Sequence, residues 1–339
     1  MKKTRIAING FGRVGRIALR IARKNKNIEV VAINNTSSVD TMANLLKYDS
    51  VYGRYDEAVN YDLDQDILLI GQDEISVTHE RQPEKLPWAD KKIDVVLECT
   101  GAFVKDRAAE AHLKAGAKAV VLSAPPKGTG DVPTYVIGVN EDNYQGDKLV
   151  SNASCTTNCV ATVAGIINRA FGFKKGFMTT IHSYTSDQNL LDNSHKDLRR
   201  ARAAAINIIP TSSGAAISTT ETIPEIAGKF DGYAVRVPTP VVSLSDFTVL
   251  VGRQVSKEEV NEAFSKKAAD PNYSHLLAVT SEPVVSSDLI GDPHSAIVDL
   301  SLTEVVDGDL IHVVAWYDNE WGYSTRLVEL AEKVVKKVK

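Results

Sequence analysis

A glycine-rich turn between an apolar run and a helical pattern constrains this chain more than any other feature. Residues 5–9 form a short apolar run that ends directly in Gly10-Phe11-Gly12-Arg13-Val14-Gly15. Apolar residues at helical spacing follow, and residues 28–34 form a second apolar run. This order predicts a strand–helix–strand unit of about 30 residues. In such a unit the glycines allow a tight turn, the approach of a pyrophosphate, and close packing of helix on strand. The pattern favours dinucleotide binding over a purely structural turn, with binding residues Gly10, Phe11, Gly12, Arg13, Val14 and Gly15.

The rest of the first half continues the alternation of strands and helices. A helix is predicted at 106–115, between two of the strands. The predicted strands lie at 93–98, 118–122, 134–139 and 148–151. Near-continuous apolar strands alternating with helices indicate a Rossmann-type parallel sheet covered on both faces. Because ligands of such sheets gather at the carboxyl ends of strands, Thr100 and Ser123 become candidate cofactor contacts. Both positions are equally compatible with ordinary turns.

The residue expected to bind the adenosine ribose is unusual. An Asp or Glu about 20 residues beyond the glycine turn commonly bonds the ribose hydroxyls. Asn35 occupies that place here, and Thr36, Ser37 and Ser38 follow it. An amide bonds a hydroxyl, but it does not repel a 2′-phosphate as a carboxylate would. Strict use of NAD is therefore not predicted.

The length of the chain indicates the number of domains, and its charge argues against several classes of binding protein. At roughly 150 residues per domain, 339 residues suggest about two domains. The net charge of −4 and a pI near 6.0 argue against a general nucleic-acid or membrane-surface binder. No apolar run approaches the roughly 20 residues that span a bilayer, and the first one stops too early for an export segment. Three cysteines are too few for a disulfide framework and favour a reducing cytoplasm.

The segment 151–159 places a cysteine where a helix is expected to begin. Ser154 suits an N-cap, so Cys155 falls in the first turn. A thiolate there gains from the helix dipole and free N–H groups, which predicts a lowered thiol pKa. The spacing to Cys159 is not that of a C-x-x-C pair, and no second pair supports a zinc site, so no metal is expected. A buried structural cysteine is an equally good interpretation of Cys155 from local sequence.

A catalytic thiol needs a base, and His182 is the best of the seven histidines. It lies in a strand-like segment that ends in polar residues, although a lone histidine in a strand more often serves packing. His195 adjoins the cationic run 196–202. A histidine in this position is typical of packing or of anion attraction. Arg236 lies between apolar neighbours in a strand, either on an exposed face or as a forked donor to a phosphate.

The second half predicts an α+β domain with a mostly antiparallel sheet. Its predicted strands are 176–184, 232–238, 242–253, 295–303 and 310–317, and its predicted helices are 156–170, 211–220, 256–268 and 321–337. Asp307-Gly308 is a hairpin signal, and Ser256 with Glu259 forms a capping box.

Taken together, the residues resemble the phosphorylating glyceraldehyde-3-phosphate dehydrogenase family along essentially the whole chain. The shared stretches, in the family's order and spacing, are 9–16, 46–50, 153–158, 195–202 and 316–323. The resemblance implies that Cys155 is the nucleophile and His182 its base. It implies that two phosphate sites are formed by Ser154, Thr156, Thr185, Arg200, Ser213, Gly214 and Arg236, with Ser213 where many relatives have Thr. It also implies that Asn319 bonds the nicotinamide carboxamide beside Tyr323, and that Arg81 lies at the adenine.

Two departures from the family concern the cofactor. Asn35 replaces the ribose-binding Asp, and Asn193-Ser194 replaces a Leu-Pro pair typical of NAD-specific members. Ser194 and Thr36 are similar to hydroxyl residues of members that accept NADP. The resemblance thus implies an enzyme that uses NADP or NAD and leans toward NADP.

The family also implies an architecture and a reaction. The expected domains are a dinucleotide-binding domain at 1–154, completed by the C-terminal helix 321–339, and a catalytic domain at 155–320. The expected assembly is a homotetramer in which the loop 186–207 reaches toward a neighbour's cofactor. The expected reaction joins glyceraldehyde 3-phosphate and inorganic phosphate to give 1,3-bisphosphoglycerate through a cysteine thioester. Alternatives are an erythrose-4-phosphate dehydrogenase, an acyl hydrolase, or a nucleotide- or RNA-binding module without turnover.

Overall fold

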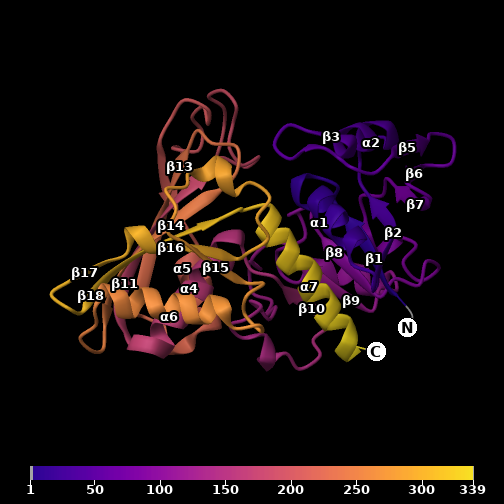
Figure 1. The fold of residues 1–339 in the computed structure, drawn as a ribbon. Helices are drawn as coiled ribbons and strands as arrows, with labels where there is room; N and C mark the ends of the chain where they lie inside the picture. Colours follow the sequence, from indigo (N-terminus) through magenta and orange to yellow (C-terminus); the bar gives the residue numbers. More distant parts are fainter. Residues whose placement is uncertain (1–2, 339) are drawn as a thin grey trace. The chain divides into compact units, whose positions relative to one another are not determined.

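The computed structural model describes residues 3–338, and their contacts divide the chain into two compact units (Figure 1). Unit 1 takes in the described residues up to Tyr135, then Asn143–Ala153 and the residues from Ser324 onward. Unit 2 takes in Val136–Asp142 and Ser154–Tyr323. Residues 1, 2 and 339, which the predicted domain bounds include, lie outside the described residues.

Unit 1 is built on an eight-stranded sheet with the order β10-β9-β8-β1-β2-β7-β6-β5. The strands are β1 (Thr4–Asn9), β2 (Ile28–Asn34), β5 (Val59–Asp62), β6 (Ile67–Ile70), β7 (Asp73–Thr78), β8 (Val95–Glu98), β9 (Ala119–Leu122) and β10 (Leu149–Ser151). Pairing is parallel from β10 through β7, whereas β6 and β5 add antiparallel strands at one edge. The predicted Rossmann-type parallel sheet is confirmed.

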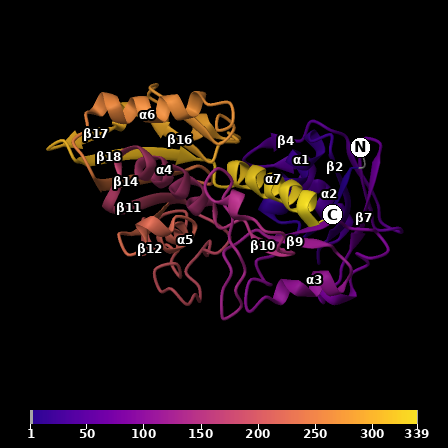
Figure 2. The same ribbon diagram turned by 90° about the horizontal axis from the view of Figure 1, so that it is seen from below.

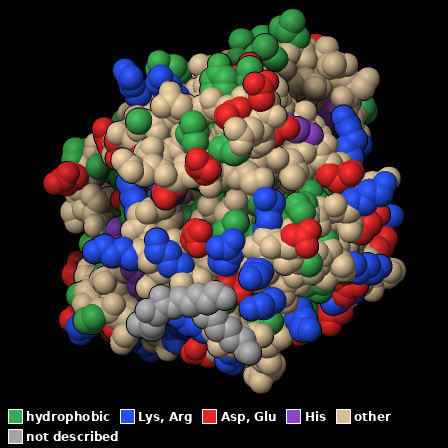
Figure 3. Space-filling view, turned by 90° about the vertical axis from the view of Figure 1, so that its right-hand side faces the viewer, with side chains coloured by type: hydrophobic (Ala, Val, Ile, Leu, Met, Phe, Trp, Pro, Cys, Tyr) green, Lys and Arg blue, Asp and Glu red, His purple; other side chains and the backbone are tan. Residues whose placement is uncertain are grey.

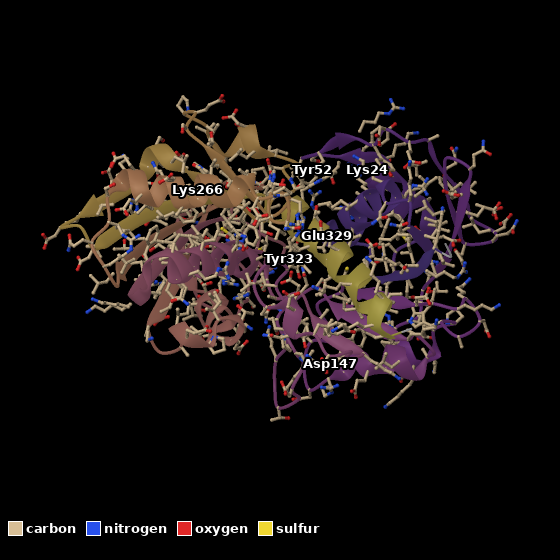
Figure 4. The ribbon with its side chains drawn as sticks, turned by 60° about the horizontal axis from the view of Figure 1, so that its bottom comes forward. Lys24, Tyr52, Asp147, Lys266, Tyr323 and Glu329 are labelled. Atoms are coloured by element: carbon tan, nitrogen blue, oxygen red, sulfur yellow. The ribbon has the colours of Figure 1, made fainter. Side chains whose placement is uncertain are left out.

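Helices and short turns surround this sheet. The elements of unit 1 besides the large sheet are α1 (Arg13–Lys24), α2 (Val39–Lys47), α3 (Ala111–Lys114), the 3₁₀ turns η1 (Pro83–Lys85) and η2 (Ala108–Glu110), and the small hairpin β3 (Tyr48–Asp49) and β4 (Gly53–Arg54). The last helix, α7 (Trp321–Val338), belongs to unit 1 from Ser324 onward, and Figure 4 labels Tyr323 and Glu329 on it. The side chains of Leu327, Leu330, Ala331 and Val334 on this helix are fully buried.

Two element predictions in the first half are wrong. Residues 134–139 do not form a strand: Thr134 makes one isolated bridge to Ser151, and Gly138, with a φ of 83°, turns the chain. Pro133 also lacks the N–H that a central strand would need. The helix predicted at 106–115 begins later, because Asp106 and Arg107 have φ values of 50° and 59° and cannot continue a right-handed helix.

Unit 2 is built on a second sheet with the order β12-β13-β11-β14-β18-β16-β15, and β17 pairs with β18. The strands are β11 (Phe173–Ser183), β12 (Ile209–Ser212), β13 (Phe230–Val237), β14 (Ser243–Val251), β15 (Leu277–Thr280), β16 (Ala296–Asp299), β17 (Glu304–Val306) and β18 (Leu310–Tyr317). The pairs β11–β13 and β15–β16 are parallel and the others are antiparallel. The predicted mostly antiparallel sheet is confirmed.

The helices of unit 2 pack on this sheet, with α4 against β11, β14, β16 and β18 (Figure 2). The helices are α4 (Cys155–Phe171), α5 (Ala215–Thr222) and α6 (Lys257–Ala269), with 3₁₀ turns η3 (Glu141–Asn143), η4 (Pro224–Ile226), η5 (Ser286–Leu289) and η6 (Leu300–Leu302). Because α4 also contacts α5 and α6, the three helices share one layer. Within residues 3–338, no helix combines the length and the apolar character needed to cross a membrane.

The local signals of the second half have mixed outcomes. The capping box of Ser256 and Glu259 is present, and Asp307 and Gly308 both have positive φ in the β17–β18 hairpin. The helix predicted at 211–220 starts only at Ala215, because Ile209–Ser212 pairs antiparallel with β13. The strand predicted at 295–303 ends at Asp299, whose side chain accepts the Ser301 N–H and caps the turn η6.

Candidate functional site

The start of α4 presents the Cys155 thiol. Ser154 is the N-cap in an extended conformation, and its hydroxyl accepts the Thr157 backbone N–H at 3.0 Å. This cap satisfies one of the free N–H groups of the first turn and fixes where the helix begins. Cys155 is therefore the first helical residue, as predicted. Its side chain is only partly exposed.

His182 brings its imidazole to this thiol from the carboxyl end of β11. Its Nε2 lies 3.4 Å from the Cys155 Sγ, and its Nδ1 lies 2.7 Å from the Ser183 carbonyl oxygen. The Arg236 Nη1 also lies 3.1 Å from Nδ1, but it donates to the same Ser183 carbonyl. Because the shorter Nδ1 contact is to the carbonyl, which can only accept, we assign the hydrogen to Nδ1 and the lone pair to Nε2. The acceptor nitrogen therefore faces the thiol, which is the orientation that a general base needs.

Arg236 lies beside this pair on the neighbouring strand. Parallel pairing of β11 with β13 places Arg236 directly opposite His182. The Arg236 guanidinium donates to the Ser183 carbonyl at 3.0 Å and lies 3.4 Å from the Thr185 hydroxyl. Its Nε is buried and has no hydrogen-bond partner among the described residues. A forked cation with an unused donor is suited to an anionic ligand.

Burial sets the charge state of the thiol and the imidazole. It raises the pKa of the Cys155 thiol, while Arg236 and the N–H groups at the start of α4 lower that pKa by less. The predicted lowering of the thiol pKa is therefore wrong for this structure. Burial, together with the positive charges of Arg236 and Arg200, lowers the pKa of His182 to about 3. At neutral pH the pair is thus a thiol facing a neutral imidazole.

The hydroxyl groups of Thr156, Tyr317 and Thr180 form a hydrogen-bonded chain next to the thiol. The Tyr317 hydroxyl lies 3.0 Å from the Thr156 hydroxyl and 2.9 Å from the Thr180 hydroxyl, and its ring packs edge-on against His182. No role was predicted for Tyr317. Its position at the polar end of the apolar strand β18 was the available signal.

Asn319 has its amide orientation fixed by two serines. Its Oδ1 accepts the Ser183 hydroxyl at 2.9 Å and the Ser243 hydroxyl at 3.0 Å. The amide oxygen is thereby used within the protein, and the amide NH₂ is the group left to act as a donor toward a ligand. Ser183 and Ser243 were not predicted as site residues. Tyr323 follows in the first turn of α7 and is buried.

Arg200 is held by the long loop and by β12. It donates to the Thr211 hydroxyl at 2.9 Å and to the Ser212 carbonyl at 3.2 Å, and it forms an ion pair with Asp187. Ser213 and Gly214 follow on the connection to α5, where the Ser213 hydroxyl accepts the Ala215 N–H. The positive charge of Arg200 lowers the pKa values of both His182 and Arg236. Arg200 and Arg236, the two arginines predicted to bind phosphate, therefore interact electrostatically with each other and with His182.

The glycine turn of unit 1 has the geometry of a dinucleotide site. Gly10 has a φ of 95°, and a Cβ there would lie 2.7 Å from the Thr100 backbone N. A Cβ on Gly15 would lie 2.1 Å from the Gly10 carbonyl oxygen, whereas one on Gly12 would meet nothing within 4 Å. The first and third glycines therefore serve close packing, and the second leaves open space where a pyrophosphate can approach.

A pocket of about 410 Å³ opens at this turn. The predicted cofactor residues that line it are Gly10, Gly12, Asn35, Thr36, Arg81 and Thr100. The side-chain Oδ1 of Asn35 accepts the Phe11 backbone N–H at 3.1 Å, which joins the ribose position to the turn. Among the remaining predicted residues, Phe11 and Gly15 are buried and Arg13 pairs with Asp49. Val14, Ser123 and Ser194 are also outside the pocket lining, and Ser194 lies exposed in the loop of unit 2.

No metal centre emerges from residues 3–338, where no group of three or more His, Cys, Asp or Glu side chains is arranged to hold an ion. Figure 3 shows one face on which Lys and Arg side chains are interspersed with Asp and Glu.

Comparison with known proteins identifies the family. Residues 4–106 match the family model "Glyceraldehyde 3-phosphate dehydrogenase, NAD binding domain", and residues 154–319 match "Glyceraldehyde 3-phosphate dehydrogenase, C-terminal domain". A glyceraldehyde-3-phosphate dehydrogenase 2 from Nostoc sp. is 50% identical over 98% of this chain and 99% of its own length. The chloroplastic glyceraldehyde-3-phosphate dehydrogenase B of Pisum sativum is 49% identical over 99% of this chain and 75% of its own length. A glyceraldehyde-3-phosphate dehydrogenase 2 from Streptomyces avermitilis is 48% identical over 96% of this chain and 97% of its own length.

The two matched models lie in order along the chain, one over the glycine turn and one over the thiol and its histidine. The chain belongs to the glyceraldehyde-3-phosphate dehydrogenase family, whose members are NAD(P)-dependent oxidoreductases.

Proposed function

We propose that this enzyme oxidises and phosphorylates glyceraldehyde 3-phosphate to 1,3-bisphosphoglycerate with NAD(P) as the hydride acceptor. The observation that carries the proposal is the 3.4 Å contact between the Cys155 Sγ and a His182 nitrogen whose lone pair faces it. In this proposal unit 1 is the dinucleotide-binding domain and unit 2 the catalytic domain.

Cys155 and His182 supply the covalent chemistry. The thiol gives its proton to the neutral His182, and the sulfur attacks the aldehyde carbon to form a hemithioacetal whose oxygen takes a proton. His182 then removes the hydroxyl proton as the carbon loses hydride, which leaves a thioester on Cys155. Inorganic phosphate attacks the thioester carbonyl, the carbon–sulfur bond breaks, the sulfur takes back the proton held by His182, and the proton of the attacking phosphate passes to water.

The dinucleotide supplies the hydride acceptor when it is bound. The residues of this chain fit such a group, because the turn leaves open space at Gly12 and the pocket lies at the start of α1. We assign Asn319, whose oxygen is held by Ser183 and Ser243, to donate its NH₂ to the carboxamide. Tyr323 would lie next to that contact.

Two anionic groups must be held at the same time, the substrate phosphate and the attacking phosphate. We assign Arg236 with Thr185, and Arg200 with Ser213 and Gly214, to these groups. Ser154 and Thr156 would contribute at the start of α4. Support comes from the unused, buried Nε of Arg236 and from its proximity to the reacting pair.

We further propose that the enzyme accepts NADP and prefers it to NAD. Asn35, in the pocket next to Thr36, carries no charge that would repel a 2′-phosphate, and Arg81 lines the same pocket. The ratio of kcat/KM for NADP to that for NAD tests this preference. A ratio above 1 supports it, and a ratio well below 1 contradicts it.

We also propose that the chain forms a homotetramer and is cytoplasmic. The loop between β11 and β12 exposes five large apolar side chains, Leu190, Leu191, Leu198, Ile206 and Ile208, each at least 73% exposed. Such a cluster is typical of a protein–protein interface. Light scattering after size exclusion should give four chain masses, and a monomer would refute the assembly.

A steady-state assay tests the activity itself. Glyceraldehyde 3-phosphate and erythrose 4-phosphate are compared, each with and without inorganic phosphate. The proposal expects phosphate-dependent nicotinamide reduction that is faster with glyceraldehyde 3-phosphate. A preference for the four-carbon sugar would identify an erythrose-4-phosphate dehydrogenase, and turnover without nicotinamide would identify an acyl hydrolase.

A further inference from the structure

A buried carboxylate lies directly beneath the glycine turn of unit 1. Glu98, the last residue of β8, is 1% exposed. Its Oε1 accepts the Thr100 backbone N–H at 2.8 Å and also the Thr100 hydroxyl. Its Oε2 accepts from the Asn9 amide at 2.5 Å and from His112 at 3.0 Å. Four donors converge on the two oxygens, so both oxygens of this side chain are used as acceptors.

The histidine partner has only one possible tautomer in its neutral form. The Trp88 indole N–H lies 2.9 Å from the His112 Nδ1, and an indole nitrogen can only donate. Nδ1 is therefore the acceptor, and Nε2 carries the hydrogen that it donates to Glu98. Both His112 and Trp88 are fully buried. The His112 ring, which the Trp88 indole holds in place, therefore fixes one side of the Glu98 carboxylate.

On its other side Glu98 holds Asn9, which precedes the first glycine, and Thr100, against which that glycine packs. Asn9 immediately precedes Gly10 at the end of β1, and the Asn9 Oδ1 accepts the Asn34 amide at 2.7 Å. Thr100 is the residue against which Gly10 packs, since a Cβ on Gly10 would lie 2.7 Å from its backbone N. Glu98 therefore fixes both the residue before the turn and the surface on which the turn lies.

We propose that Glu98 and His112 are positioning residues for dinucleotide binding, which hold the glycine turn in the conformation that receives the pyrophosphate. The inference rests on the proposed function, because it assigns to that function two residues that do not touch the cofactor themselves. An ordinary structural role for the same pair would lower stability without a selective effect on the cofactor.

The central variant is Glu98→Gln, which keeps the shape but turns one accepting oxygen into an NH₂ group facing donors. The matched control is Asp94→Asn at the other end of the same strand segment. Asp94 is also buried, accepts from the Arg5 N–H at 3.0 Å and Lys118 at 2.8 Å, and precedes the end of β8 opposite to Glu98. His112→Gln, which retains a donor near the Nε2 position, is compared with His112→Phe, which removes it.

The experiment measures dinucleotide dissociation constants by calorimetry, KM and kcat by steady-state assay, and unfolding by circular dichroism, all on the full chain. We expect Glu98→Gln to raise the cofactor Kd and KM by about tenfold or more, with kcat at saturating cofactor changed by less than about threefold. Asp94→Asn should leave cofactor Kd and KM within about twofold, although it destabilises the fold. His112→Gln should retain more cofactor affinity than His112→Phe.

The inference is overturned if folded Glu98→Gln binds the dinucleotide as the unmodified protein does, or if Asp94→Asn weakens binding equally. Should Glu98→Gln not fold, the ordering of the two His112 variants decides the matter, and equal affinities would overturn the inference. Failure of the unmodified chain to bind either dinucleotide would instead contradict the proposed function.

Discussion

The pocket of unit 1 and the thiol site of unit 2 are built in different ways. The pocket lies around one continuous glycine turn, and most of its other lining residues lie at or beyond the ends of neighbouring parallel strands. The thiol site gathers single side chains from α4, β11 and β13: Arg236 meets His182 because β13 pairs with β11, and Cys155 reaches them because α4 packs on the sheet. A binding pocket spreads its contacts over many residues, whereas a reactive site depends on each reacting atom.

This difference predicts how each region responds to substitution. In unit 2, removal of one reactive atom should stop the chemistry while the fold remains. In unit 1, changes should act on cofactor affinity in graded steps. The following predictions test that contrast, from the largest expected effect to the smallest.

Cys155→Ala should abolish the phosphorylating activity, because no other group can form the thioester. Steady-state nicotinamide reduction measures the loss. Cys159→Ala is the matched control: this thiol is fully buried one helical turn away and should leave most of the activity. Substantial activity in Cys155→Ala would show that the site does not depend on this atom.

His182→Gln should lower kcat by about 10²–10⁴, since the general base is lost while the nucleophile remains. The pH profile of kcat should change as well. His312→Gln, in the same sheet but bonded to Asp246, should leave kcat nearly unchanged. An equal loss in the two variants would point to a packing role for His182.

Arg236→Gln should raise the KM for the aldehyde substrate or for phosphate by about 10-fold or more, because a charge-assisted donor is lost. Initial rates over a matrix of both substrates separate the two constants. Arg253→Gln, a substitution of a surface arginine paired with Glu259, should leave both KM values intact. Unchanged constants in Arg236→Gln would rule out phosphate binding there.

Gly12→Ala and Gly15→Ala should separate binding from folding in unit 1. A Cβ on Gly12 meets no protein atom, so the fold should be preserved while the cofactor KM rises. A Cβ on Gly15 would lie 2.1 Å from the Gly10 carbonyl oxygen and should destabilise the fold by about 1–3 kcal/mol. Urea unfolding and cofactor titration give the two quantities. Wild-type cofactor affinity in Gly12→Ala would contradict the proposal that the open space at Gly12 receives the pyrophosphate.

His182 should also make the folded state sensitive to acid. Its pKa is lowered from 6.5 to about 3, so between these values the unfolded chain binds a proton that the folded site does not. Stability from this group is therefore present above pH 6.5 and is lost as the pH falls toward 3. Relative to His182→Asn, the free energy of unfolding should fall by about 1 kcal/mol per pH unit in this window. Parallel curves for the two proteins would contradict the buried neutral state.

The same contrast explains what could be predicted from sequence. The glycine turn, the apolar strands around it and the N-cap at Ser154 depend on neighbouring residues, so local patterns identified them. The antiparallel strands β5 and β6 lie at a sheet edge and are only four residues long; β5 is largely polar and β6 is an aliphatic run too short to assign, so neither was predicted. The helix expected at 211–220 failed because pairing with β13 outweighed local preference over residues 209–212.

The candidate site shows the same limit. Local sequence left Cys155 evenly balanced between a catalytic and a structural role and favoured packing for His182, its best candidate base, and the family resemblance assigned both to catalysis. Ser183 and Ser243 hold Asn319 through contacts that span 136 and 76 residues, so no local pattern could reveal them. The raised pKa of Cys155 likewise follows from burial by distant segments rather than from its place on the helix.

The central claim is that one sulfur carries the acyl group. Mass spectrometry of the full chain, mixed with glyceraldehyde 3-phosphate and NAD(P) in the absence of inorganic phosphate, tests it directly. The account predicts an acyl adduct on the peptide that contains Cys155, removed when phosphate is added and absent from Cys155→Ala. Reduction of the nicotinamide with no adduct on Cys155, or with the adduct on another residue, would contradict it.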